Sequence, residues 1–239
     1  MKIAIEIIRQ RKFDFSHHHL IDILISKQLS PFFSEIYIKK NIKPNTITIH
    51  MILSGIVGAI FFSLPFLSFK IIGVILLQLW YVLDCSDGEV ARWTKCFSTF
   101  GQELDYMAHI INHPLYGLSM LFSLLQLHKY PISFIIFLIL FSNITDLINR
   151  NLFAINIIKS YKLTSTKVFP SDKRNSFLKI LLGNFVSYPN LILFSVLFYF
   201  IDMYLGTNIV VFLFALNIIS TSFNILILSV KYLKCFHKE

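Results

Sequence analysis

The sequence predicts an all-α integral membrane protein with six transmembrane helices preceded by an amphipathic interfacial helix. The 239 residues are 55% hydrophobic and only 15% charged, and long uncharged stretches recur along the chain. A soluble domain usually carries about a quarter charged residues, so a chain this apolar could not cover a water-facing surface. Only 13 residues are acidic, yet Asp84, Asp87 and Glu89 crowd beside a long apolar run. That crowding requires a physical reason.

The N-terminal segment, residues 1–43, is expected to lie on the cytoplasmic face of the membrane. Its first residues are interrupted by Lys2 and Glu6, so they cannot form the apolar region of a signal peptide. From Leu20 to Ile36 apolar residues recur at helical spacing, which predicts an amphipathic helix in the interface plane, bent or broken near Pro31. The preceding tract His17–His19 could bind a metal, but a polar helix start is the favoured interpretation.

The remaining chain, residues 44–239, is predicted to be one six-helix membrane domain. A helix needs about 20 apolar residues to cross the hydrocarbon core. Four stretches carry no formal charge. Residues 44–69, 180–201 and 203–230 predict three full spans, and residues 130–145 predict a short one. Two further spans flank the acidic cluster: a run from Ile71 to Leu83 that continues into it, and the stretch from Gly101 to Leu127.

The basic residues predict the orientation of these spans. Of the 22 Lys and Arg residues, only Lys70 and Lys129 fall on the connections assigned to the far side. The positive-inside rule then places both termini in the cytoplasm, in a multi-pass protein of the inner (cytoplasmic) membrane. The net charge of +9 describes a cytoplasmic rim. Nucleic-acid binding is disfavoured, because the basic residues are not interleaved with exposed stacking aromatics.

Ionisable residues at a membrane edge are costly, which makes the polar segment from Asp84 to His109 the predicted functional site. Asp84 and Asp87 are three apart on one helix face, and Asp105 and His109 are four apart on another. The short connection makes these helices antiparallel neighbours across a polar cleft. Clustered carboxylates need a compensating cation, and Mg²⁺ favours carboxylates together with substrate phosphate oxygens. Structural pairing of the acids with Arg92 is the alternative interpretation.

Several other residues in and around this segment have predicted roles. Arg92 is a candidate phosphate clamp, with a membrane-interface anchor as its alternative, and small residues nearby leave room for a bulky ligand. Trp80, Tyr81 and Trp93 are interpreted as interfacial belt residues. Four polar residues end the fourth span: Asn143, Asp146, Asn149 and Arg150. They could bind an acceptor, but a capped, solvated helix end is the favoured interpretation.

The order D-x-x-D-G-x-x-A-R, eight residues, then G-x-x-x-D resembles the signature of the CDP-alcohol phosphatidyltransferase family. The matching residues are Asp84, Asp87, Gly88, Ala91, Arg92, Gly101 and Asp105. The segment Pro44–Thr48 looks like the one that opens the first span in this family. The resemblance covers roughly the first half of the chain, and the later spans agree only in number and polarity.

The resemblance implies an enzyme of the EC 2.7.8 type with a nucleotide cavity open to the cytoplasm. Such an enzyme transfers a phospho-alcohol or phosphatidyl group from a CDP-linked donor to a hydroxyl acceptor and releases CMP, in phospholipid or related lipid or surface-glycopolymer synthesis. Either partner can carry the acyl chains, and homodimers are common in the family. Carried onto this chain, the metal ligands for Mg²⁺ or Mn²⁺ are Asp84, Asp87 and Asp105. The implied CDP contacts are Asn45, Thr48, Gly88, Arg92, Ser98 and Gly101.

One departure from the family motif falls at His109. The family has a fourth Asp four residues after the third, which is thought to hold a metal and to deprotonate the attacking hydroxyl. A neutral imidazole can act as a general base near pH 7 but is a poor ligand for Mg²⁺, so His109 is expected to be the catalytic base. Asn112 and His113 continue the same helical stripe and are candidates for replacement polar contacts.

Two other classes of function compete with the enzyme. Loss of the fourth Asp is compatible with a catalytically impaired CDP-binding membrane scaffold protein. A small transporter is disfavoured, because the second half shows neither the internal repeat nor the broken helices that transporters of this size carry.

Overall fold

The computed structural model describes residues 2–10, 25–164, 188 and 190–236. Within this part of the chain nearly every residue is helical and no strand occurs. The helices are α1 Lys2–Gln10, α2 Lys27–Lys39, α3 Pro44–Ser63, α4 Leu67–Thr94, α5 Gly101–Leu125, α6 Ile132–Thr164, α8 Asn190–Leu205 and α9 Ile209–Phe236. The tract His17–His19 and the first residues of the predicted amphipathic helix, 20–24, lie outside the described residues.

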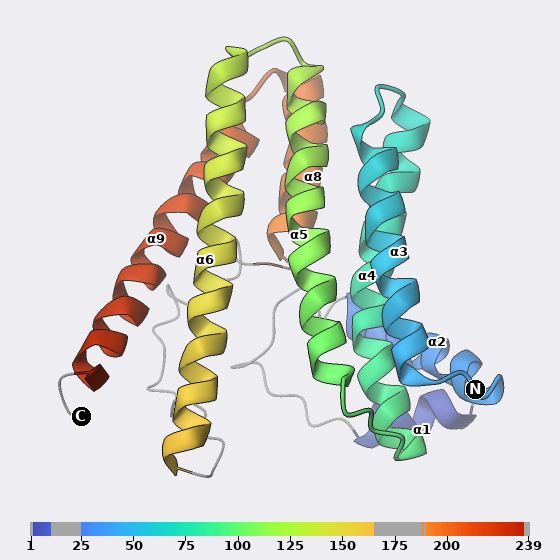
Figure 1. The fold of residues 1–239 in the computed structure, drawn as a ribbon. Helices are drawn as coiled ribbons and strands as arrows, with labels where there is room; N and C mark the ends of the chain where they lie inside the picture. Colours follow the sequence, from blue (N-terminus) through green and yellow to red (C-terminus); the bar gives the residue numbers. More distant parts are fainter. Residues whose placement is uncertain (1, 11–24, 165–187, 189, 237–239) are drawn as a thin grey trace.

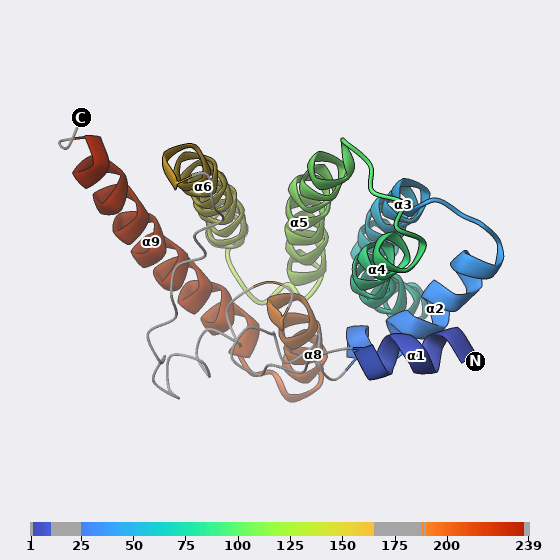
Figure 2. The ribbon, with the colours of Figure 1, turned by 90° about the horizontal axis from the view of Figure 1, so that it is seen from below.

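The long helices run alongside one another, and α1 and α2 lie across the lower end of the bundle (Figure 1). Helix α3 packs on both α4 and α5, α5 packs on α6, and α9 packs on both α6 and α8. Seen from below, α3 and α4 form one flank and α6 and α9 the other, with α5 between them (Figure 2). Helices α4 and α5 pack most closely on α3, and side chains of α4 and α5 meet where Asp84 and Trp80 approach His109.

The chain is a helical membrane protein. By length and composition, four helices in the described part could cross a membrane, with apolar portions Pro44–Ser63, Leu67–Thr94, Ile132–Ile155 and Ile209–Val230. Helix α8 is apolar but has only 16 residues, and α5 has 25 residues but carries the polar side chains of the predicted site. Six spans therefore remain a prediction, while the all-helical architecture is confirmed.

Charged residues are poor markers of where these helices end. Lys70, predicted to lie on a far-side connection, is inside α4 and only 3% exposed. Its Nζ donates to the carbonyl oxygen of Phe62 at 3.0 Å and to Ser123 Oγ at 2.9 Å, and it lies 5.1 Å from the ring centre of Tyr199. These partners allow an ammonium group to be buried and tie α4 to α3, α5 and α8.

A second boundary prediction was wrong at the fourth span. Helix α6 continues to Thr164 instead of ending near Asp146, and its apolar portion extends to Ile155. Asn143 and Asp146 are buried, so they do not form a solvated helix end. The belt interpretation was also wrong for Trp80 and Tyr81, which are buried in the core.

Asp202 was predicted to separate the last two spans, and it is a buried residue that caps the start of α9. It lies in the last turn of α8 and is 2% exposed. Its two carboxylate oxygens accept hydrogen bonds from the backbone N–H groups of Ile209 and Val210, both at 2.9 Å, and from the hydroxyl of Thr207. The carboxylate thereby satisfies donors at the start of α9 that have no partner within their own helix.

Glu89 fastens α2 to the lower end of α4. Its carboxylate accepts hydrogen bonds from Ser30 Oγ and Ser34 Oγ, each at 2.7 Å, and Ser86 Oγ donates to the carbonyl oxygen of Ser30 at 3.1 Å. Helix α2 runs through Pro31 without a break, contrary to one of the sequence-based options. Pro31 lies near the helix start, where few backbone hydrogen bonds are lost.

Helix α1 is in turn attached to α2 through Glu35. One carboxylate oxygen accepts the backbone N–H of Ala4 at 3.0 Å, and the other lies 2.6 Å from Lys39 Nζ. The Lys39 ammonium, with the N–H of Ala4, lowers the pKa of Glu35 to about 2. The opposite side of α2 exposes the apolar side chains Leu29, Phe32 and Ile36.

Glycines allow α3 and α4 to touch along their backbones. A Cβ at Gly73 would lie 2.5 Å from the backbone nitrogen of Phe62 and 2.8 Å from the carbonyl oxygen of Gly58. Small residues at such contacts let membrane helices approach closely, because packing rather than hydrophobicity drives their association. Helix α5 uses the same device on α3, where the side chain of Asn112 fills the space over Gly55.

We predict that Gly73→Ala lowers the thermal unfolding midpoint in detergent. The added methyl overlaps rigid backbone, and overpacking of this kind typically costs about 1–3 kcal/mol. The matched control is Ile75→Ala on the same helix, where the side chain is 62% exposed and its loss leaves the α3 contact intact. Equal midpoints for both variants would show that the α3–α4 contact has been misassigned.

Candidate functional site

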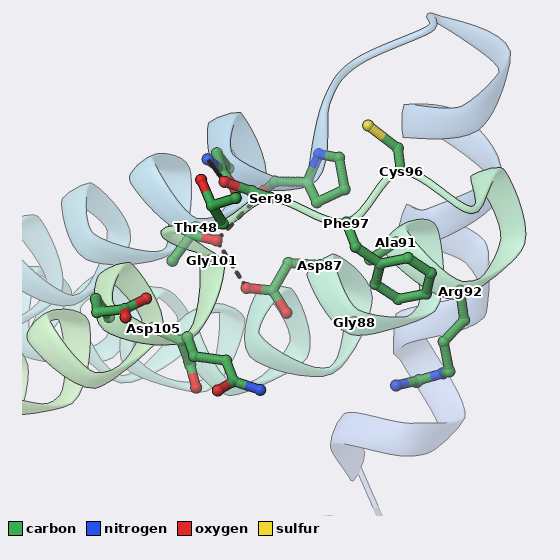
Figure 3. Close-up of a pocket in the computed structure, with 15 residues that line it drawn as sticks. Thr48, Asp87, Gly88, Ala91, Arg92, Cys96, Phe97, Ser98, Gly101 and Asp105 are labelled. Atoms are coloured by element: carbon green, nitrogen blue, oxygen red, sulfur yellow. Dashed lines mark hydrogen bonds between the residues drawn. The ribbon is translucent and has the colours of Figure 1, made fainter.

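A pocket of about 570 Å³ lies at the lower end of the bundle, between the start of α3, the end of α4, the α4–α5 linker and the start of α5 (Figure 3). It contains all six residues expected to contact CDP. The lining residues are Pro44, Asn45, Thr48, Asp87, Gly88, Ala91, Arg92, Cys96, Phe97, Ser98, Thr99, Gly101, Gln102, Glu103 and Asp105. The structure therefore brings the two halves of the predicted nucleotide set, from α3 and from α4–α5, to one cavity.

The α4–α5 linker is fixed over the start of α3 by Ser98. Ser98 Oγ accepts hydrogen bonds from Asn45 Nδ2 at 3.0 Å and from the backbone N–H of Phe100 at 3.2 Å. The turn that starts the linker places Lys95 in the left-handed region, with φ of 55°. Asn45 and Ser98 thus shape the pocket by holding its walls together.

Asp87 forms part of the pocket wall and is held by α3. Its Oδ2 accepts a hydrogen bond from Thr48 Oγ1 at 2.8 Å (Figure 3). At the next residue, a Cβ at Gly88 would lie 3.1 Å from Nη1 of Arg92, which is one turn further along α4. Glycine at this position therefore lets the guanidinium lie close to the helix backbone, inside the pocket.

Asp84, Asp105 and His109 form a second group beside the pocket. Each offers one ligand atom, and these atoms lie within 4.8 Å of one another. His109 Nε2 lies 3.5 Å from Asp84 Oδ1 and 3.6 Å from Asp105 Oδ1, which is too long for good hydrogen bonds. Asp87 stands outside this triad, on the pocket wall, so the three predicted metal ligands occupy two adjoining places.

The triad has the features of a site for a divalent cation. Asp105 Oδ1 and His109 Nδ1 are buried and have no hydrogen-bond partner within the described part of the chain. Buried polar atoms normally find partners, so atoms left without them are candidates for ligand or ion contacts. Two carboxylates and an imidazole at this spacing fit a divalent ion such as Mn²⁺, and Mg²⁺ through the carboxylates.

Directly behind the triad, His113 joins a buried ionic network with Asp146 and Arg150 of α6. His113 Nδ1 lies 3.2 Å from Asp146 Oδ2, and His113 Nε2 lies 3.1 Å from Arg150 Nη2. Arg150 Nε also donates to Asp146 Oδ2 at 3.0 Å. Because a guanidinium can only donate, His113 Nε2 must accept and Nδ1 must carry the proton, which makes the imidazole neutral. Both ring nitrogens are therefore engaged away from the triad.

Aromatic rings connect this network with His109. The ring centre of His109 lies 5.4 Å from that of His113 and 6.0 Å from that of Trp80, and Tyr188 stacks on His113 at 3.9 Å. Trp80 was not predicted to lie near the site. His113 was predicted only as a replacement polar contact, although its spacing of four residues from His109 places both rings on one helix face.

The chain matches a known protein family. A sequence profile of the family described as CDP-alcohol phosphatidyltransferase matches residues 41–169, more than half of the 239-residue chain. The matched stretch includes α3, α4, α5 and every predicted site residue, which confirms the resemblance drawn from the motif. Members of this family generally depend on a divalent metal. A search of curated proteins finds no match to this chain.

We predict that Asp146→Ala destabilises the protein by about 3 kcal/mol, because it leaves the partly buried Arg150 without its carboxylate. The double variant Asp146→Ala, Arg150→Ala should lose clearly less than the sum of the two single losses, since no unpaired charge remains. The coupling is tested by measuring the thermal unfolding midpoints of Asp146→Ala, Arg150→Ala and the double variant in one detergent. Strictly additive losses would contradict the network.

Proposed function

The chain belongs to the CDP-alcohol phosphatidyltransferase family, and on that premise we propose that it transfers a phospho-alcohol or phosphatidyl group from a CDP-linked donor to a hydroxyl acceptor. One observation carries the proposal: Asp105 belongs both to the pocket lining and to the acid–imidazole triad. A nucleotide-sized cavity therefore shares a wall with the residues able to do the chemistry. A volume of about 570 Å³ is in the usual range for small-molecule sites.

The charges around the pocket support a diphosphate together with a cation. Of the described lining residues Arg92 alone is basic, whereas Asp87, Glu103 and Asp105 are acidic. Arg92 can clamp a phosphate through two parallel N–H bonds. The remaining acids would repel a diphosphate unless a divalent ion lay between them.

Asp84 and Asp105, with Asp87 at the adjoining pocket wall, are the residues that would hold this ion. Bound there, Mg²⁺ or Mn²⁺ would neutralise the diphosphate and stabilise the CMP leaving group. Asp105 Oδ1 is buried and has no hydrogen-bond partner among the described residues, which supports this assignment.

His109 is proposed as the base. The oxygen of the acceptor hydroxyl attacks the phosphorus that bears the donor's alcohol, the bond from that phosphorus to the oxygen of CMP breaks, and the hydroxyl proton passes to His109. Protonation at Nε2 is favoured by the Oδ1 atoms of Asp84 and Asp105, 3.5 and 3.6 Å away. Packing against His113 and Trp80 keeps the ring in one orientation.

In this proposal the site faces the cytoplasm, both termini are cytoplasmic, and the protein lies in the inner membrane. In support, α1, the α4–α5 linker and the last turn of α9 all lie at the lower end (Figure 1). Residues 1–43 form the interfacial segment, and the exposed apolar face of α2 supports contact with lipid. Residues 44–239 form the catalytic domain, in which α5 and α8 complete six spans.

A catalytically impaired CDP-binding scaffold protein is the second candidate. The observation that favours it is His109 itself, which replaces a carboxylate of the family motif and removes one negative charge from the cluster. The scaffold retains the pocket and nucleotide binding but lacks turnover.

We predict that purified protein releases CMP when it is supplied with Mg²⁺ or Mn²⁺, a matching CDP-alcohol and a matching acceptor. The panel of alcohols should include glycerol phosphate, serine, inositol phosphate, ethanolamine and polyols. Each is tested with the acyl chains on the CDP-linked donor and, separately, with the acyl chains on the acceptor. Release should stop with EDTA and in the variants Asp84→Asn and Asp105→Asn. Measurable CDP binding without CMP release for any pair would favour the scaffold over the enzyme.

We predict that His109→Ala lowers kcat by about 100-fold or more, as expected for loss of a general base, whereas His109→Asp retains or raises activity. Asp restores the family's carboxylate at this position and can accept the same proton. Both variants should still bind CDP, which serves as the folding control. An unchanged kcat in His109→Ala would remove His109 from the mechanism.

A further inference from the structure

Phe97 is a large apolar side chain in an unusual position. It lies on the α4–α5 linker, is 72% exposed, and lines the pocket. Phe100, on the same linker, is also 72% exposed but does not line the pocket. The two residues therefore form a natural comparison between an aromatic ring at the pocket and one outside it.

The linker presents Phe97 from a fixed position. The Oγ of its neighbour Ser98 accepts hydrogen bonds from Asn45 Nδ2 at 3.0 Å and from the backbone N–H of Phe100 at 3.2 Å. The Ser98 carbonyl oxygen accepts a further hydrogen bond from the N–H of Gly101 at 3.4 Å. A residue adjacent to such an anchored position loses little further freedom when a ligand contacts it.

Asp105 and the ring of Phe97 lie toward opposite ends of the pocket (Figure 3). In Figure 3 the ring of Phe97 lies beside Ala91 and Arg92, on the side of Asp87 away from Asp105. Ala91 contributes only a methyl group there, and the Arg92 guanidinium lies over Gly88, so the ring lies next to the side chain that can hold a phosphate. A ligand whose diphosphate lies near Arg92 and the acids would extend its other end toward this ring.

We propose that Phe97 stacks on the pyrimidine base of the CDP-linked donor and is a nucleotide-binding residue outside the family motif. The assignment rests on the proposed function of the pocket. An aromatic face attracts any base, because every base has a π-face, so Phe97 contributes affinity rather than choice of base. Stacking would also cover apolar surface that is otherwise exposed to water.

The test compares CMP with inorganic pyrophosphate, which has the charged groups but no base. Binding of each in the presence of Mn²⁺ is measured by calorimetry on detergent-purified wild type, Phe97→Ala, Phe97→Trp and Phe100→Ala. We expect Phe97→Ala to weaken CMP binding about tenfold, which corresponds to the stacking of one base. Phe97→Trp should restore it, Phe100→Ala should leave it unchanged, and pyrophosphate should bind all four proteins equally.

Four outcomes would overturn the assignment. Unchanged CMP affinity in Phe97→Ala would exclude stacking, and an equal loss for pyrophosphate would indicate general damage to the pocket. An equal loss in Phe100→Ala would assign both rings to linker stability or to membrane contact. Wild-type protein that binds no CMP would instead reject the proposed function, and the assignment with it.

Discussion

The cost of placing charge inside a membrane is the constraint on which the rest of the structure depends. In the described helices this cost is offset by specific partners. Lys70 donates to a carbonyl and a hydroxyl, Asp202 caps α9, and Asp146 pairs with Arg150. The triad at Asp84 differs, because it contains buried atoms without partners. In the proposed function a divalent cation would be the partner of this group.

The same constraint explains why three acids can crowd together on α4. Successive residues on a helix turn by about 100°, so Asp84 and Asp87 lie about 60° apart on one face of α4, whereas Glu89 points away from both. Glu89 holds the serines of α2, Asp87 accepts the hydroxyl of Thr48, and Asp84 faces His109. One short segment thus docks the interfacial helix, shapes the pocket and contributes to the proposed metal site.

The helices and most of the site could be predicted because their signals are local. The motif and the Pro44–Thr48 segment identified many of the residues that line the pocket, although not Phe97, and uncharged runs located the long helices. Predictions failed where a charge was read as a helix boundary, at Lys70 and Asp146, since the partners Ser123 and His113 lie tens of residues away in sequence. Trp80 was misread for a similar reason, because only the fold places it against His109.

The proposed metal site at the triad is tested most directly by a titration of Mn²⁺ in the presence of CDP. The concentration of free Mn²⁺ is measured by electron paramagnetic resonance. We expect wild-type protein to bind Mn²⁺ and Asp105→Asn to weaken binding by about tenfold or more. Glu89→Gln is the matched control and should bind Mn²⁺ as the wild type does, since the Glu89 carboxylate accepts hydrogen bonds from Ser30 and Ser34 of α2. Equal affinity in all three proteins, or no binding by the wild type, would contradict the account.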